Sequence, residues 1–283
     1  DSLLHNMGRI DPMDLLLAPG WVPRVTRLSG RRALRDFRGI VADTMDRRKA
    51  DIAVGKPVPD DFLTLLLALE GPDGLTRDEI EDNILTFIGA GHETTARALA
   101  WTLYCVAESP QFRILMEEEI DRVLAEGADP VDWLEKMPHV RAAFEEALRL
   151  YPPAPSINRA PLEDDHWTDD EGRTITLPKG ESVLVMPWTL HRHTLYWEKP
   201  RQFMPERFLP GNREKLHRFQ YLPFGAGPRI CIGATFALQE AVIALAVLMK
   251  RYRFDVTPNT RAWPVQRLTT QPLNGIAMSV SAR

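Results

Sequence analysis

Cysteine is scarce in this 283-residue sequence, which holds only Cys105 and Cys231. Two cysteines so far apart argue against a disulfide framework and leave each thiol free, as in a reducing compartment, so we expect a cytoplasmic protein. No CxxC pair offers the ligand spacing of a zinc site. An excess of one charge is also missing, because 35 Lys and Arg nearly balance 39 Asp and Glu. The net charge of -4 gives no sign of nucleic-acid binding, and we expect no nucleic-acid partner.

Long apolar runs, linkers and repeats are missing as well. Residues 234–249 form the most apolar stretch near the C-terminus, but Gln239 and Glu240 interrupt it and it is too short to span a membrane. No signal peptide opens the chain, and no Gly/Ser-rich linker or repeat divides it. We therefore expect a single domain over residues 1–283 with no membrane span. Residues 1–4 resemble the interior of a helix and include no initiator Met, so we also expect an N-terminal truncation.

The remaining composition is that of a globular protein, with 44% hydrophobic and 26% charged residues. Apolar residues recur at helical spacing in the segments 31–49, 62–69, 76–108, 110–126, 139–150 and 234–252. The longest segment starts with a capping box, Thr76 and Glu79, and we expect it to be buried. Alternating patterns predict two hairpins, at 173–186 and 265–280. Residues 200–230 are rich in Pro, Gly and aromatics without a steady period, which predicts an ordered irregular loop. The sequence thus predicts a mainly α fold with small β-sheets.

Residues 224–233, FGAGPRICIG, place one cysteine between glycines at the entrance to an apolar helix. Glycines let the backbone bend and approach a flat cofactor closely. Backbone N–H groups at the helix N-terminus stabilise a negative charge on sulfur, and the thiolate can then ligate iron. The alternative is that Cys231 is a small buried hydrophobic residue and that the glycines only shape a turn.

This segment resembles the haem-binding signature of the cytochrome P450 family, Phe-x-x-Gly-x-Arg-x-Cys-x-Gly, at every fixed position. The resemblance implies the C-terminal part of the P450 fold, with haem b as cofactor and Cys231 as the axial iron ligand. Thiolate ligation pushes electron density toward the metal and favours O–O cleavage. Arg229 is then expected to neutralise a haem propionate. The other residues of this segment expected at the haem are Phe224, Gly225, Gly227 and Gly233.

A second motif, residues 90–95 with the sequence AGHETT, lies inside the longest predicted helix, where a glycine and two threonines lower helix propensity. It resembles the family's Ala/Gly-Gly-x-Asp/Glu-Thr-Thr pattern. The resemblance implies that Glu93 and Thr94 are a catalytic acid–alcohol pair that handles protons beside the O2 site. It also implies that Ala90 lies near the haem and that Gly91 leaves space for dioxygen. The alternative is a helix kink with a solvated acid.

Glu146 and Arg149 lie one helical turn apart just before a Pro-Pro pair, and Arg207 follows downstream. They resemble the family's Glu-x-x-Arg helix and its third member, an Arg in the loop ahead of the cysteine. A buried acid between two guanidiniums is costly unless fully paired, so we expect these residues to hold the irregular loop in one geometry. His191 and His193 match the family's stretch before the loop, and we interpret them as structural rather than metal-binding.

Arg159 resembles the family's strand arginine that reaches a haem propionate, with a solvated loop Arg as the alternative. Positions that match the family's substrate pocket are mostly apolar and favour a small lipophilic substrate. These positions are Phe87, Ala90, residues 155–157 and Leu273.

The resemblance implies a monooxygenase that inserts one oxygen atom of O2 into its substrate. Electrons are expected from a ferredoxin or a flavoprotein reductase, because the sequence holds no flavin or Fe–S segment. The resemblance begins partway through the family's architecture, so we expect the family's N-terminal helices to be absent. Two alternatives stay open. One is a thiolate-haem peroxygenase, isomerase or dehydratase, against which the intact Glu93–Thr94 pair argues; the other is a haem-binding fragment without turnover.

Overall fold

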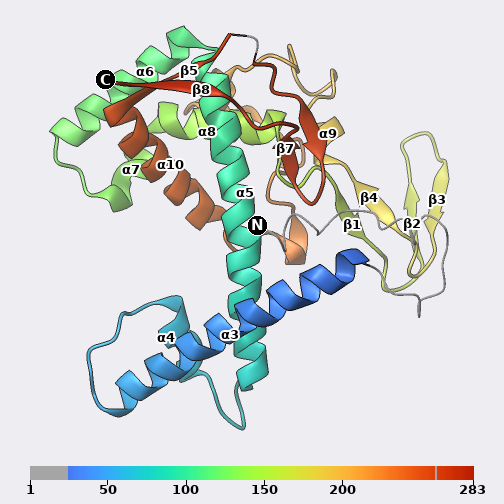
Figure 1. The fold of residues 1–283 in the computed structure, drawn as a ribbon. Coiled ribbons are helices and arrows are strands. Elements are labelled where there is room, and N and C mark those ends of the chain that lie inside the picture. The colour runs from blue at the N-terminus through green and yellow to red at the C-terminus, as the bar shows by residue number, and fades with distance from the viewer. Residues whose placement is uncertain (1–24, 259) are drawn as a thin grey trace. The chain divides into compact units, whose positions relative to one another are not determined.

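Figure 1 shows the computed structural model of the chain, which describes residues 25–258 and 260–283. The helical character expected for residues 1–4 lies outside these residues. Contacts divide the chain into two compact units, Asp1–Glu93 and Thr94–Arg283. Each unit is described by itself.

The described residues of the first unit form α3 (Val25–Ala53), α4 (Phe62–Ala68) and the first half of α5 (Arg77–Ala107). The expected capping box opens α5, because Thr76 N donates to Glu79 Oε2 at 2.8 Å and Glu79 N donates to Thr76 Oγ1 at 3.3 Å. Apolar side chains of all three helices form a small core. Its buried members are Val41, Met45, Leu66, Leu67 and Ile80.

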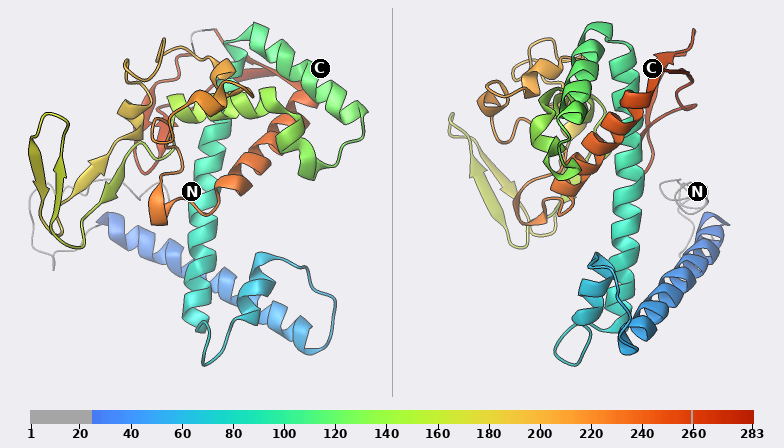
Figure 2. Two further views of the ribbon diagram at one scale, coloured as in Figure 1. Left: turned by 180° about the vertical axis from the view of Figure 1, so that it is seen from behind. Right: turned by 90° about the vertical axis from the view of Figure 1, so that its left-hand side faces the viewer.

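The second unit contains the rest of α5 and the main helical core (Figures 1 and 2). Its further helices are α6 (Pro110–Ala125), α7 (Trp133–Lys136), α8 (Pro138–Leu150), α9 (Pro187–Leu190) and α10 (Ala234–Arg251). Its 3-10 turns are η1 (Pro130–Asp132), η2 (Pro205–Phe208), η3 (Arg213–Lys215) and η4 (Gly227–Arg229). α8 packs against α6, α10 and η2 and is buried from Ala142 to Leu150.

Sequence explains where α8 begins and ends. Pro138 at its first turn needs no hydrogen-bond partner for a backbone N–H. The next two donors are satisfied by the Glu119 carboxylate of α6, which accepts from His139 N at 2.9 Å and from Val140 N at 3.1 Å. The helix ends at Leu150, ahead of two prolines that cannot continue it.

Four two-stranded antiparallel sheets complete the second unit. They pair β1 (Ile157–Arg159) with β4 (Val183–Val185), β2 (Asp165–Thr168) with β3 (Thr174–Leu177), β5 (Tyr252–Val256) with β8 (Met278–Ala282), and β6 (Pro264–Gln266) with β7 (Thr270–Pro272). The β2–β3 hairpin, yellow in Figure 1, extends away from the helices of its unit, and every residue of β2 is exposed. The structure confirms the expected mainly α fold with small sheets.

The hairpin predicted at 173–186 is wrong in its pairing. Both segments are strands, but they do not pair with each other. β3 pairs with the preceding strand β2, and β4 pairs with β1. β2 is missing from the prediction because its exposed residues, Asp165 to Thr168, carry no apolar alternation. The turn at Gly180 is hydrogen-bonded to a segment that precedes β2, because Gly180 N donates to Pro161 O at 3.0 Å.

The hairpin predicted at 265–280 is also wrong. β6 and β7 form a shorter hairpin, whose turn is closed by Arg267 N donating to Thr269 O at 3.1 Å. The last strand, β8, pairs instead with β5, so that Phe254 faces Val280 across the ladder. The prediction relies on the turn-forming residues Asn274 and Gly275, but the chain after them pairs with the distant β5 instead. Alternating apolar residues in β5 are the signal that could have revealed this pairing.

α5 is buried along only part of its length. Ala98, Trp101 and Cys105 are buried in the second unit, where the Trp101 ring stacks on Tyr151 at 3.8 Å. Phe87 and Ile88 are exposed, so the expectation of a helix buried throughout is wrong. Over the described part of the chain, no helix combines the length and apolar character needed to cross a membrane.

Candidate functional site

Cys231 lies between η4 and α10 as a free, exposed thiol. The loop closes on itself, because Cys231 N donates to Phe224 O at 2.9 Å and Ile230 N donates to Gly227 O at 3.1 Å. Gly233 is the N-cap of α10. The sulfur is therefore exposed beside a helix N-terminus, whose unpaired N–H groups favour an anion. The alternative of a buried, inert cysteine is wrong for Cys231 but fits Cys105, which is buried.

Glycines are needed in this loop for two separate reasons. Gly225 and Gly227 have φ angles of +75° and +74°, in the left-handed region that residues with a side chain rarely adopt. A Cβ at Gly233 would lie 3.9 Å from Cys231 Sγ, so a larger residue there would project toward the sulfur. A Cβ at Gly225 would lie 3.6 Å from Ile157 Cδ1, which places β1 against the loop.

The two arginines expected at the cofactor are both exposed. Arg229 ends η4, two residues before the cysteine, and Arg159 ends β1, the strand that contacts the loop. Arg159 Nη1 donates to Asn158 O at 2.8 Å. Among the described residues, no carboxylate forms an ion pair with either guanidinium. Each is therefore available to an external carboxylate.

The expected Glu146 cluster (Glu146, Arg149 and Arg207) is confirmed. Arg149 donates twice to the carboxylate, from Nε at 2.7 Å and from Nη2 at 2.8 Å, and neither side chain has any exposed surface. Arg207 Nε lies 3.5 Å from Glu146 Oε1. Burial raises the pKa of Glu146, and the hydrogen bonds from Arg149 oppose that shift. A pair this deeply buried is stable only while both charges stay together.

The Glu146 cluster binds backbone groups that lie ahead of the Cys231 loop. Arg149 Nη1 donates to His191 O at 2.6 Å and to Pro200 O at 2.7 Å. Met204 N donates to Glu146 Oε1 at 2.8 Å. The cluster thus fixes the chain from the end of α9 to η2, as the sequence predicted.

His191 is fully buried and provides a contact that the sequence did not reveal. Its Nε2 accepts a 2.8 Å hydrogen bond from Leu222 N, two residues before Phe224. Burial lowers the pKa of His191 to about 3, so the ring is neutral near pH 7 and can accept this bond. The interpretation of His191 as structural is confirmed, and its structural role is to hold the base of the Cys231 loop.

The 90–95 motif lies within the unbroken helix α5. Apart from the nearby backbone of α5 itself, a Cβ at Gly91 would meet no atom of the described residues within 4 Å. Glu93 and Thr94 are half-buried, and the boundary between the two units falls between them. The helix runs without a break through the glycine, and the alternative of a helix kink with a solvated acid stays open. The catalytic roles of Glu93 and Thr94 stay predictions.

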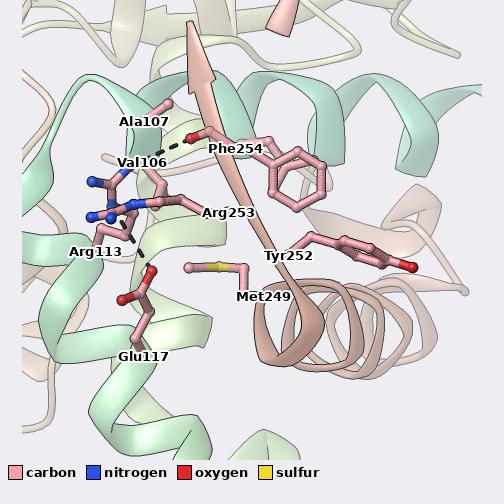
Figure 3. A pocket seen from close by; sticks show the side chains of 9 residues that line it. Val106, Ala107, Arg113, Glu117, Met249, Tyr252, Arg253 and Phe254 are labelled. Carbon is pink, nitrogen blue, oxygen red and sulfur yellow. Dashed lines mark hydrogen bonds and ion pairs between the residues drawn. The ribbon is translucent and has the colours of Figure 1, made fainter. Parts of the chain in front are cut away.

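A shallow hollow lies at the other end of α10 from Cys231 (Figure 3). Met249 and Tyr252 line it, together with Arg113, whose Nη1 donates to Phe254 O at 3.4 Å. An 18-residue helix is about 27 Å long, so this hollow is remote from the thiol. It is not part of the candidate site.

Comparison with known proteins identifies the family. The family model described as Cytochrome P450 matches residues 6–278, nearly the whole chain. The chain belongs to the cytochrome P450 family. Human cytochrome P450 4Z1 is 36% identical over 220 residues, which cover 76% of this chain and 43% of the human protein. A pig taurochenodeoxycholic 6 alpha-hydroxylase is 34% identical over 223 residues, 78% of this P450 chain and 43% of its own length.

A solved structure supports the same assignment. The crystal structure of the cytochrome P450DA heme domain matches with a TM-score of 0.82 at 26% identity, and the match covers 100% of this P450 chain and 59% of the crystallised one. The chain thus spans less than half of the two curated relatives and about three fifths of that structure. The fold agrees with the expected C-terminal part of the P450 fold.

Proposed function

We propose that this P450 chain is the haem-binding part of a monooxygenase, with Cys231 as the iron ligand. The observation that carries the proposal is the exposed Cys231 thiol, held in a closed glycine-containing loop at the N-terminus of α10. Members of the family bind haem b, and the groups around this thiol fit it. A flat iron cofactor with two carboxylates needs an exposed thiol as ligand, a backbone that can approach the ring closely, and arginines nearby for the carboxylates. This chain offers all three.

Each residue has a specific role in this proposal. Cys231 binds the iron, while Arg229 and Arg159 bind the propionates. The close backbone at the haem is supplied by Phe224, Gly225, Gly227 and Gly233 of the Cys231 loop. Ala90 is proposed as a haem contact from its match to the family motif alone. When bound, thiolate-ligated haem supplies the redox chemistry that activates O2.

Protons are handled by the chain's own side chains. Glu93 holds a proton on its carboxylate and releases it toward the O2 site. The Thr94 hydroxyl orients the water or group that receives it. Both residues are half-buried, which limits, without abolishing, exchange with bulk solvent. We further propose that residues 1–283 act as one haem-binding domain.

The substrate in this proposal is a small lipophilic molecule, and the electrons come from a ferredoxin or a flavoprotein reductase. The pig relative is named a taurochenodeoxycholic 6 alpha-hydroxylase, which supports a hydroxylation reaction. Phe87, Ala90, residues 155–157 and Leu273 are the positions proposed to contact it, from their match to the family's pocket. All of them except Ser156 are apolar, as a lipophilic substrate requires.

Turnover with isotopically labelled O2 tests the proposal. The chain is supplied with NAD(P)H, a reductase with or without ferredoxin, and taurochenodeoxycholate as the first substrate in a panel of lipophilic acids. We expect one labelled oxygen atom in each product molecule and no product from the Cys231→Ala variant. Product formed without O2 or without reductant would instead assign the chain to a thiolate-haem isomerase, dehydratase or peroxygenase. Haem binding without any turnover would reduce it to a haem-binding fragment.

A further inference from the structure

α8 carries two adjacent buried glutamates, and the Glu146 cluster uses only one of them. Glu145 is 1% exposed and also contacts two arginines. Arg213 of η3 donates to Glu145 Oε1 from Nη2 at 2.9 Å. Arg141, one turn earlier on α8, donates to Glu145 Oε2 from Nε at 3.2 Å. We call Glu145, Arg141 and Arg213 the Glu145 cluster.

The same part of α8 also holds the chain that follows η3. Tyr221 OH donates to the backbone oxygen of Glu145 at 2.9 Å. The Tyr221 ring packs against Phe208, with centroids 4.7 Å apart. The next residue, Leu222, donates its N–H to His191. Residues 213–222 are therefore held at their first end by the Glu145 carboxylate and at their last end by Tyr221 and Leu222.

Residues 213–222 lead directly into the Cys231 loop. Gly225 N donates to Leu222 O at 3.2 Å, and Cys231 N donates to Phe224 O at 2.9 Å. A displacement of residues 213–222 would therefore be transmitted to the backbone on which Cys231 lies. The Glu146 cluster holds the chain before Phe208, whereas the Glu145 cluster holds the chain after it.

We propose that the Glu145 cluster is a second ionic anchor that positions the Cys231 loop, acting on residues 213–222 independently of the Glu146 cluster. Without Arg213, the Glu145 carboxylate keeps only Arg141 and stays buried with less compensation. η3 is then no longer held to α8, and the hydrogen bonds at Leu222, Gly225 and Cys231 open more often. The cluster is a positioning device, because none of its members lies within the loop.

Amide hydrogen exchange of the full 283-residue chain without cofactor tests the proposal. In Arg213→Gln, we expect the Leu222, Gly225 and Cys231 amides to exchange at least tenfold faster, while Lys215→Gln in the same 3-10 turn changes them less than twofold. Lys215 is the matched control because, among the described residues, its Nζ donates a hydrogen bond only to Asn212 Oδ1, at 2.9 Å. Unchanged exchange at these three amides in Arg213→Gln would overturn the proposal.

A second pair of variants separates positioning from general stability. Glu145→Gln keeps the size of the side chain and removes its charge. Glu119→Gln on α6 does the same at a position that is also buried, 5% exposed against 1% for Glu145, but that caps the far end of α8. We expect only Glu145→Gln to accelerate exchange selectively in residues 222–231. Equal acceleration by both variants, or acceleration spread over the whole second unit, would reduce Glu145 to a general stabiliser of α8.

A spectroscopic measurement extends the test to the haem-loaded chain and rests on the proposed function. The reduced, carbon-monoxide-bound spectrum of Arg213→Gln should lose part of its thiolate band, and Arg213→Lys should restore most of it. A full thiolate band in Arg213→Gln would contradict positioning of the ligand. If the unmodified chain shows no thiolate band, the proposed function fails, while the exchange measurement still decides the role of the Glu145 cluster.

Discussion

The Cys231 loop and the 90–95 motif on α5 both carry the proposed chemistry, but they are built differently. The motif lies in a regular helix, where backbone hydrogen bonds are satisfied within the element. The loop contains only the short 3-10 turn η4 among its described residues, and the chain that leads into it is held from outside, by the Glu145 backbone oxygen of α8 and by the His191 ring. We infer that distant substitutions can disturb the ligand loop, whereas the chemistry of the helix motif can be changed without disturbing its structure.

The largest expected effect comes from opening the Glu146 cluster. Glu146→Ala leaves Arg149 buried without its carboxylate, which should lower the free energy of unfolding by about 3–5 kcal/mol. The exposed pair Arg122–Glu126 is the control, because Glu126→Ala should cost less than about 1 kcal/mol. Urea unfolding of both variants measures the difference. Equal losses of unfolding free energy in the two variants would mean that burial does not make the Glu146–Arg149 pair more stabilising than an exposed pair.

Acidification should weaken the loop support through His191. Its pKa is about 3 in the folded chain and about 6.5 when unfolded, so the unfolded chain binds more protons between these values. Stability therefore falls as pH falls through this window, by about 1.4 kcal/mol per pH unit. Between pH 7 and 4, His191→Gln should lose about 3 kcal/mol less than the unmodified chain. His193→Gln, at an exposed position, should follow the unmodified curve; identical curves for all three chains would refute the assignment.

At pH 7, substitution of His191 should have a smaller effect on the free energy of unfolding. His191→Leu leaves the Leu222 N–H without its acceptor and should cost about 1–3 kcal/mol. His191→Gln offers an amide oxygen in a similar place and should recover most of that loss. Urea unfolding is the measurement. A glutamine variant as unstable as the leucine variant would mean that packing, not the hydrogen bond, is what His191 contributes.

The helix motif should show the smallest structural and the clearest chemical effect. Thr94→Ala should change stability by about 0.5 kcal/mol or less but uncouple NAD(P)H consumption from product formation. Thr86→Ala is the control on the same helix, because the Thr86 hydroxyl donates to the Asp82 backbone oxygen and to no other atom in the described part of the chain. The ratio of product to NAD(P)H consumed measures the coupling. Unchanged coupling in Thr94→Ala would show that the acid–alcohol role is misassigned.

The sequence predicts this molecule well where the signal is local. Capping residues and prolines mark the ends of α5 and α8, and the Cys231 loop is recognised by the order of its own residues. Glu146 and Arg149 share one helical face, so their pairing could be expected as well. The cytoplasmic location inferred from the cysteines stays a prediction.

Contacts between distant segments could not be predicted in the same way. Arg213 and Glu145 are 68 residues apart and look like solvated charges in the sequence. The pairing of β5 with β8 depends on a helix end that brings Tyr252 into the sheet, and β2 has too polar a sequence to look like a strand. In each case burial or pairing is decided by tertiary packing, which a local pattern does not contain.

The central claim, that Cys231 is the iron ligand, is tested most directly by the reduced, carbon-monoxide-bound absorption spectrum of the haem-loaded chain. The account predicts a red-shifted thiolate band that Cys231→Ala abolishes and that Cys105→Ala, at the buried thiol, leaves intact. A thiolate band that survives in Cys231→Ala, or a chain that binds no haem at all, would contradict it.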